Sequence, residues 1–124
     1  MRGRETLTLG AVGEELAVRF LQAQGYQLLV RNYTCGLGEI DLVARDGGYL
    51  VFVEVKTRRS DLKGLPAEAV TPRKRRQVIK TAKAYLQARV AVGEADCRFD
   101  VVSVLLRHGE EPVVEVIRDA FGER

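Results

Sequence analysis

The sequence has few of the residues that build sulfur or imidazole metal sites: two cysteines and one histidine among 124 residues, and no tryptophan. Cys35 and Cys97 stand alone, without a partner cysteine at metal-ligand spacing, so we expect two ordinary reduced thiols. His108 lies in a turn and is expected at the surface. Repeats and glycine-rich loops of the kind that hold nucleotide phosphates are also absent.

Long apolar runs are missing as well. No stretch of 18 apolar residues occurs, and residues 1–5 lack the apolar segment of a secretory signal. We therefore expect a cytoplasmic protein with no membrane partner. With 46% hydrophobic and 30% charged residues, the composition is that of an ordinary globular protein. We expect a single domain over residues 1–124, with a core that needs no disulfide or metal.

Positive charge is concentrated in one part of the chain. Between Lys56 and Arg89 there are eleven lysines and arginines against two acids, Asp61 and Glu68, a local charge of +9. The whole chain carries +3, so the remainder is acidic, at −6. A basic segment beside an acidic one is what a metal-dependent enzyme acting on a polyanion needs.

Residues 38–56 predict a β-hairpin, two strands of alternating character joined by a turn of two adjacent glycines. In the register that this turn sets, Asp41 lies opposite Glu54 and Glu39 lies opposite Lys56. Side chains alternate along a strand, so these four share one face. The other face is expected to be apolar throughout, with Ile40, Leu42, Val51, Val53 and Val55.

Such a cluster of acids is unfavourable if its role is only structural. Two carboxylates about 5 Å apart repel by roughly 3 kcal/mol at an effective dielectric constant near 20. One lysine cannot neutralise three acids, whereas a divalent cation such as Mg²⁺ prefers oxygen ligands of this kind. The alternative is that these are solvated charges on an exposed strand face. A three-residue turn without a bulge would also separate Asp41 from Glu54.

Asp41 followed by Glu54-Val55-Lys56 on the next strand resembles the Asp…(Asp/Glu)-x-Lys signature of the restriction-endonuclease-like nuclease superfamily. A longer set of motifs over residues 10–104 resembles the YraN family, whose members are predicted nucleases and are similar to archaeal Holliday-junction resolvases. These motifs are Gly13-Glu14, Gly38-Glu39-Ile40-Asp41-Leu42, Phe52-Val53-Glu54-Val55-Lys56-Thr57-Arg58 and Arg98-Phe99-Asp100-Val101-Val102.

The expected fold is a restriction-endonuclease-like α/β domain, a central mixed sheet flanked by two helices, in the order α-β-β-β-α-β-β. Apolar periodicity predicts a first helix over residues 8–24, with Thr8 as the N-cap and Gly25 as the C-terminal stop. A second helix begins at Thr71–Pro72, with threonine as the N-cap and proline at the first helical position. The remaining strands are expected over residues 26–32, 98–106 and 112–117.

Three other features follow from the pattern. Residues 57–70 have no apolar period and predict a long, mobile loop that could order on substrate. Asp100 falls in a buried strand and needs a partner, and we expect a structural ion pair with Arg98, two residues away on the same face. The tail from Asp119 onward is expected to be frayed.

Glu14 lies at the border of the apolar stripe of the first helix and could lean over the sheet. Periodicity alone fits a solvated helix-flank glutamate equally well. The resemblance to the resolvases, which place a glutamate from the first helix in the metal site, favours a catalytic role.

The second helix carries six lysines and arginines in its first three turns. This basic start opposes the helix dipole, so helix stability does not explain it. A solvated face explains most such runs, but six cations without an interleaved acid favour contact with phosphates. No aromatic residue is interleaved to stack on bases, which favours backbone contact. The expected nucleic-acid-binding residues are Arg58, Arg59, Arg73, Lys74, Arg76 and Lys80.

The hypothesis is therefore a metal-dependent nuclease. Asp41 and Glu54 would hold Mg²⁺ or Mn²⁺, with the Val55 carbonyl as a further ligand, while Lys56 would position the attacking water. Glu14 would complete the outer shell, and Glu39 would be an accessory. The partner would be nucleic acid, with DNA favoured, and a homodimer would suit a symmetric junction.

Two other functions stay open. A nucleic-acid-binding protein that keeps the nuclease fold without turnover predicts binding that weakens steeply with salt and ignores chelators. A plain scaffold domain predicts affinity for neither metal nor nucleic acid.

Overall fold

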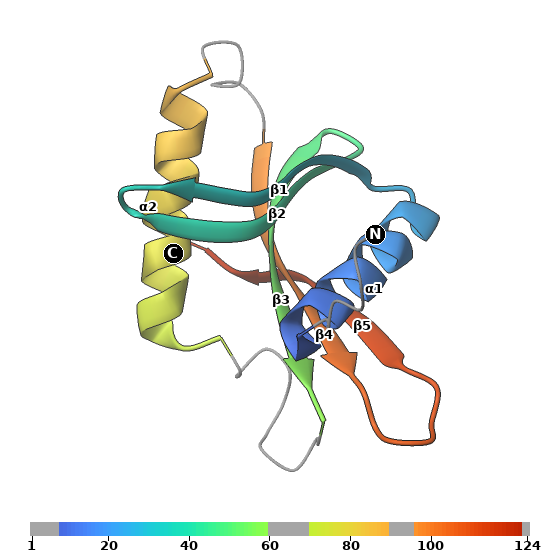
Figure 1. The fold of residues 1–124 in the computed structure, drawn as a ribbon. Coiled ribbons are helices and arrows are strands. Elements are labelled where there is room, and N and C mark those ends of the chain that lie inside the picture. Colours follow the sequence, from blue (N-terminus) through green and yellow to red (C-terminus); the bar gives the residue numbers. More distant parts are fainter. Residues whose placement is uncertain (1–7, 60–69, 90–95, 123–124) are drawn as a thin grey trace, which may run out of the picture.

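The structure of the chain, a computed structural model, describes residues 8–59, 70–89 and 96–122. Its helices and strands follow the order α-β-β-β-α-β-β, as expected (Figure 1). They are α1 (Leu9–Ala23), β1 (Gln27–Cys35), β2 (Gly38–Asp46), β3 (Tyr49–Arg58), α2 (Pro72–Gln87), β4 (Asp96–Leu105) and β5 (Val113–Phe121).

The five strands form one mixed sheet in the order β1-β2-β3-β4-β5. Neighbouring strands are antiparallel except β3 and β4, which run parallel because the segment containing α2 connects them. Helix α1 packs on one face of the sheet and α2 on the other, so the sheet is the middle layer (Figure 1). The expected mixed sheet flanked by two helices is confirmed.

Both faces of the β2–β3 hairpin are largely apolar, which corrects the expectation of one apolar and one charged face. Leu42 and Val53 are buried in the core under α1. Val43 and Phe52 point the other way and are buried in the core under α2. Asp41 and Glu54 therefore interrupt a sheet that is covered on both sides, whereas Glu39 is exposed.

Helix α1 begins and ends where the sequence predicts. The Thr8 side chain accepts a hydrogen bond from the Ala11 N–H, and Gly25 turns the chain after the helix with a φ of +95°. Gly13 brings the helix close to β3, because a Cβ at this position would collide with the side chain of Thr57. Its neighbour Glu14 is thereby held near the acids of the hairpin.

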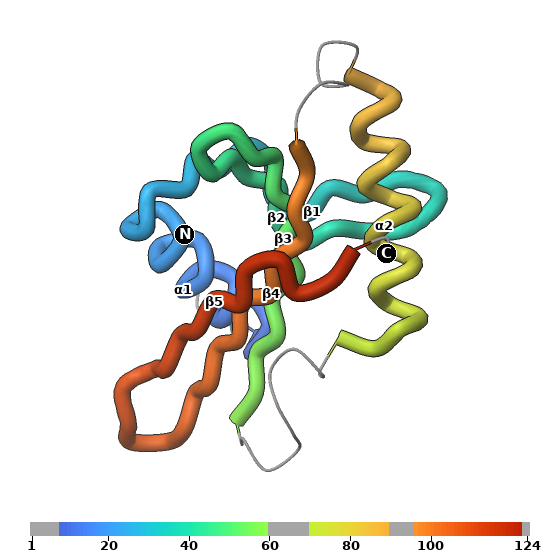
Figure 2. The backbone as a smooth tube through the Cα atoms, turned by 180° about the vertical axis from the view of Figure 1, so that it is seen from behind, coloured from blue at the N-terminus to red at the C-terminus, as the bar shows by residue number. Residues whose placement is uncertain are grey.

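The β1–β2 ribbon bends away from the rest of the sheet and crosses α2 (Figures 1 and 2). At its far end, Gly38 lies so near α2 that a Cβ there would meet Gln77 and Thr81. Ile40, expected beside Leu42 on one face, is buried instead in the core under α2. The strict alternation expected along β2 is therefore wrong on the far side of the bend.

Helix α2 also starts as predicted, with the Thr71 side chain accepting from the Lys74 N–H and Pro72 at the first position. The predicted loop over residues 57–70 begins later than expected, because β3 continues to Arg58 in its pairing with β4. Residues 60–69 of that loop lie outside the described residues.

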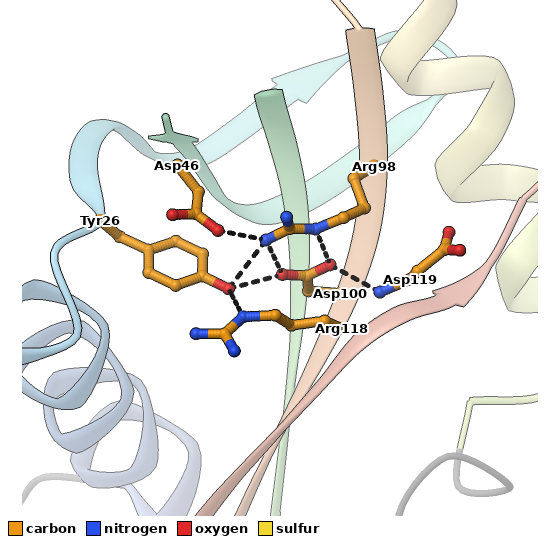
Figure 3. Close-up of polar contacts among 6 residues, drawn as sticks. All are labelled: Tyr26, Asp46, Arg98, Asp100, Arg118 and Asp119. Atoms are coloured by element: carbon orange, nitrogen blue, oxygen red, sulfur yellow. Dashed lines mark hydrogen bonds and ion pairs between the residues drawn. The ribbon is translucent and has the colours of Figure 1, made fainter. Parts of the chain in front are cut away.

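The predicted Arg98–Asp100 ion pair is confirmed and belongs to a larger network (Figure 3). Asp100 is fully buried and accepts two hydrogen bonds from Arg98, at 2.9 and 2.8 Å, and one of 2.8 Å from the Tyr26 hydroxyl. Asp46, at the end of β2, pairs with Arg98 at 2.8 Å. Burial and the hydrogen bond to Asp100 raise the pKa of Tyr26, against the opposing effect of Arg118.

The expectation of a frayed tail from Asp119 is wrong, because β5 continues to Phe121. The Asp119 N–H donates to Asp100 at 2.9 Å, and Phe121 is buried against Phe99 with ring centroids 5.2 Å apart. The C-terminal end of β5 is thus held in place by one polar and one apolar contact.

The remaining expectations concern surface chemistry. Neither Cys35 nor Cys97 is in a disulfide, and His108 is exposed in a turn. Across the described residues, neither helix is long and apolar enough to span a bilayer.

Candidate functional site

The acids Asp41 and Glu54 lie where β2 separates from β3. The ladder between these strands runs in the predicted register from the turn to the Leu42–Val53 pair. Beyond it, the Asp41 carboxylate takes the place of a ladder partner and accepts the Val55 N–H at 2.8 Å. The Asp41 N–H in turn makes a long contact of 3.4 Å to the Glu54 carboxylate. The backbone of each strand thus fixes the acid of the other.

Burial and mutual repulsion make this acid pair electrostatically costly. Glu54 is 4% exposed, and loss of water followed by the nearby charge of Asp41 raises its pKa from 4.5 to about 8. Burial also raises the pKa of Asp41, against the opposing hydrogen bond from Val55. At neutral pH the pair therefore retains a proton or requires a cation.

Lys74 supplies part of the missing positive charge. It lies in the first turn of α2, and its Nζ is 3.7 Å from the Glu54 carboxylate, where its charge lowers the pKa of both acids. The sequence placed Lys74 among phosphate contacts. The structure places it against the acid pair, because the start of α2 lies beside Glu54 of β3 in the fold.

The acids open into a cleft formed by two adjoining hollows of about 470 and 390 Å³ that share Asp41, Val55 and Lys56. We call this the acid cleft. The structure brings all five polar side chains predicted for the site to it, together with the Val55 backbone. Its wall contains Glu14, Asn32, Glu39, Asp41, Glu54, Val55, Lys56, Thr57 and Lys74.

Glu14 reaches the acid cleft from α1, as predicted from its place on the helix. Its carboxylate accepts from the Asn32 side-chain amide at 3.0 Å and from Arg31 at 3.3 Å, and its charge contributes to the raised pKa of Asp41. The side chain is 16% exposed. Hydrogen bonds therefore hold Glu14 in the cleft, and it is not a solvated glutamate on the flank of the helix.

Glu39 and Lys56 both line the acid cleft, but not as the cross-strand pair that the hairpin pattern predicted. The β2–β3 ladder ends at Leu42, and Glu39 pairs instead with Thr34 of β1. The bend of the β1–β2 ribbon carries Glu39 away from β3. Lys56 stays exposed on β3 at the mouth of the cleft.

A basic groove of about 600 Å³ continues from the acid cleft along the first half of α2. Thr71 and Lys74 line both, so the two are continuous. Four of the six predicted nucleic-acid-binding residues are in its wall, which contains Gly36, Leu37, Thr71, Arg73, Lys74, Arg76, Gln77 and Lys80. Arg58 and Arg59 lie at the end of β3, apart from the described residues of this wall.

The donor set fits a hard divalent cation in a site that is completed by other ligands. In the described part of the chain, no three Asp, Glu, His or Cys side chains gather as a ready ligand set. The acid cleft offers the close carboxylates of Asp41 and Glu54. Mg²⁺ commonly binds through one or two carboxylates and keeps water or substrate phosphate as its other ligands. The residues therefore fit such an ion together with a phosphate, more than a closed protein cage.

Sequence reasoning missed two members of the cleft. Lys74 was recognised as basic, but its pairing with Glu54 depends on tertiary structure. Asn32 gave no signal, since a single asparagine in a strand is ordinary. The Gly13-Glu14 motif of the sequence has a physical reason: Gly13 lets the helix approach β3 closely.

Known proteins are similar to this chain over most of its length. A family model described as "Uncharacterised protein family UPF0102" matches residues 13–104. The UPF0102 protein of Geotalea daltonii is 48% identical over 98% of this chain and 97% of its own. That of Chlorobaculum parvum is 54% identical over 91% of each, and that of Rhodococcus opacus is 46% identical over 93% and 97%.

Among solved structures, one described as an EndoMS-dsDNA2 complex aligns with 80% of this chain and 38% of that chain. At 22% identity and a TM-score of 0.40, that likeness is too low to carry a functional argument. The family model and full-length relatives agree with the motifs read from the sequence: the chain belongs to the UPF0102 family, which is the YraN family.

Proposed function

We propose that this protein hydrolyses phosphodiester bonds of nucleic acid with the help of a divalent cation, Mg²⁺ or Mn²⁺. The observation that carries the proposal is the pair of a half-buried Asp41 and a buried Glu54, which share one lysine and open into a cleft. A pair with a deficit of positive charge is poor as a structural element, and its net negative charge is what a cation site needs.

Five residues of the acid cleft have distinct parts. Asp41 and Glu54 would hold the cation, with the Val55 carbonyl as a further oxygen donor. A bound divalent cation supplies Lewis-acid activation of the phosphate and a more acidic water. Lys56, exposed at the mouth of the cleft, would orient the attacking water and offset charge that develops on the phosphate. Lys74 lowers the pKa of Glu54 and so favours its ionised form.

The basic groove indicates the substrate. Arg73, Arg76 and Lys80 line a groove that leads to the acids, so a chain of phosphates in it would pass the cation site. Contacts of this type neutralise the backbone and do not read sequence. We propose DNA as the substrate, with branched DNA included, and RNA is distinguished by the test below.

One observation favours a second function, a nucleic-acid-binding protein that does not turn over. Lys74 already contacts a carboxylate oxygen of Glu54 at 3.7 Å, where a cation ligand would be. If that ion pair persists when nucleic acid is bound, the groove would bind phosphates and the acids would stay closed to metal.

The test is cleavage of labelled linear, flapped and four-way DNA, and of matching RNA, with Mg²⁺, Mn²⁺ or EDTA. We expect metal-dependent products from the wild type and none from Asp41→Ala or Lys56→Ala. Glu115→Gln, which alters an exposed acid on the edge strand β5, is the matched control and should cleave normally. Cleavage that persists in Asp41→Ala would reject the proposal. Tight, salt-sensitive binding without cleavage would favour the second function.

A further inference from the structure

Asn32 has a left-handed backbone in the middle of a strand. Its φ is +53°, and among the described non-glycine residues only Asp119 shares this conformation. A non-glycine residue pays an energetic cost there, and such residues persist where the surrounding structure demands them. Asparagine bears the cost better than most residues, because its short amide can bond locally.

The conformation occurs where the β1–β2 ribbon bends. Arg31 pairs with Leu42 and Tyr33 pairs with Ile40, so Asn32 lies opposite Asp41 between these pairs. Leu42 is buried under α1 and Ile40 under α2. The ribbon thus changes face at the position of the first acid.

The side chain of Asn32 uses this geometry to reach α1. Its amide donates to Glu14 Oε1 at 3.0 Å, and Arg31 donates to the same oxygen at 3.3 Å. Both donors contact Oε1, which leaves Oε2 for the acid cleft. Arg31 is 40% exposed and also pairs with Glu15, so the amide of Asn32 is the shorter and more specific contact.

We propose that Asn32 is a positioning residue of the acid cleft. Its left-handed backbone places the amide against Glu14, and this contact would hold the Glu14 carboxylate toward a cation bound at Asp41 and Glu54. The inference rests on the proposed function, because it assigns to Asn32 an effect on cation binding. Outer-shell partners of this kind commonly change metal affinity by 10–100-fold.

Asn32→Gly removes the side-chain amide but keeps the backbone conformation, since glycine adopts the left-handed conformation without strain. The variant therefore tests the effect of the amide alone. We expect Mn²⁺ affinity, measured by calorimetry, to fall about tenfold or more, while the melting temperature in EDTA stays within a few degrees of the wild type. Asp119→Gly is the matched control, because it relaxes the same backbone conformation outside the cleft. It should leave Mn²⁺ affinity unchanged.

A double mutant shows whether Asn32 acts through Glu14. Glu14→Gln should lose Mn²⁺ affinity by itself, and adding Asn32→Gly should cost nothing further. Wild-type affinity in Asn32→Gly, an equal loss in Asp119→Gly, or additive losses in the double mutant would each overturn the inference while the proposed function stands.

The contact can also be tested without metal. The Asn32 side-chain amide resonances of ¹⁵N-labelled wild-type protein in EDTA should shift on Glu14→Gln, whereas an unchanged spectrum would overturn the inference. Absence of Mn²⁺ binding by the wild type would reject the proposed function. In that case the amide resonances decide whether Asn32 holds Glu14.

Discussion

Replacing Glu54 by glutamine should stabilise the protein in the absence of metal. A rise in the pKa of Glu54 from 4.5 to about 8 corresponds to about 5 kcal/mol at 1.36 kcal/mol per unit, which is the upper limit for what its ionisation costs the folded state. Glutamine has nearly the same size as glutamate, and it replaces the carboxylate by a neutral, polar amide. We expect it to recover about 2 kcal/mol at pH 8.5, or about 5–10 °C in melting temperature.

The pH dependence gives this prediction its sign. The pKa of Glu54 is higher in the folded than in the unfolded protein, so the folded protein binds the extra proton between about pH 4.5 and 8. The associated stability is fully present below about pH 4.5 and is lost as the pH rises through about 8. The advantage of Glu54→Gln should therefore be small at pH 5 and largest above pH 8.

Thermal melting in EDTA from pH 5 to 9 measures this difference, with Glu115→Gln as the control for loss of an exposed glutamate. Adding Mn²⁺ at pH 8 should then raise the melting temperature of the wild type, because a ligand that binds only the folded protein stabilises it. The melting temperature of Glu54→Gln should not change, since this variant lacks one of the two carboxylates that would hold the cation. A variant less stable than the wild type at pH 8.5, or a gain that is the same at every pH, would refute the reasoning.

Three further predictions concern the surroundings of the site. Gly13→Ala forces α1 away from Thr57, and urea denaturation should show a loss of about 1–3 kcal/mol. Asp100→Asn removes the fully buried carboxylate that pairs with Arg98 and leaves that arginine with the partly exposed Asp46, and the same assay should show a loss of about 3–5 kcal/mol. In the double variant Arg76→Ala/Lys80→Ala, the slope of log binding constant against log salt should become shallower by up to about 2, measured by fluorescence anisotropy on a DNA duplex. An unchanged slope would place the bound phosphates elsewhere.

Local rules predicted the parts of this fold that are decided locally. The Thr71 cap follows from hydrogen bonding within the first turn of a helix, and Gly25 from the conformation that ends one. The hairpin register from the turn to Leu42 follows from the length of the turn. Such features depend on neighbours in the sequence, which is why the pattern reveals them.

The features that the sequence missed depend on contacts between distant elements. The sequence pattern predicts that side chains alternate between the two faces of β2 through Asp41. The β1–β2 ribbon bends at this point to pack on α2, so Ile40 lies on the other face of the sheet. Lys74 meets Glu54 only because the chain crosses from β3 to α2. The tail from Asp119 was expected to fray, whereas Phe121 stacks on a ring of β4, a contact that no local pattern shows.

The two polar clusters of this protein make opposite use of charge, and this contrast separates a structural network from a candidate site. Around Asp100, two arginines, a tyrosine hydroxyl and a backbone N–H serve buried acceptors, so every charge has a partner and removing one should destabilise the fold. At Asp41 and Glu54, a half-buried and a buried acid share one lysine, so removing a charge should stabilise the fold. Natural proteins keep such a deficit where function requires it, because selection for stability alone would remove it. The sign of the change in unfolding free energy on neutralising each cluster is therefore evidence about function, and it can be measured without knowledge of the substrate.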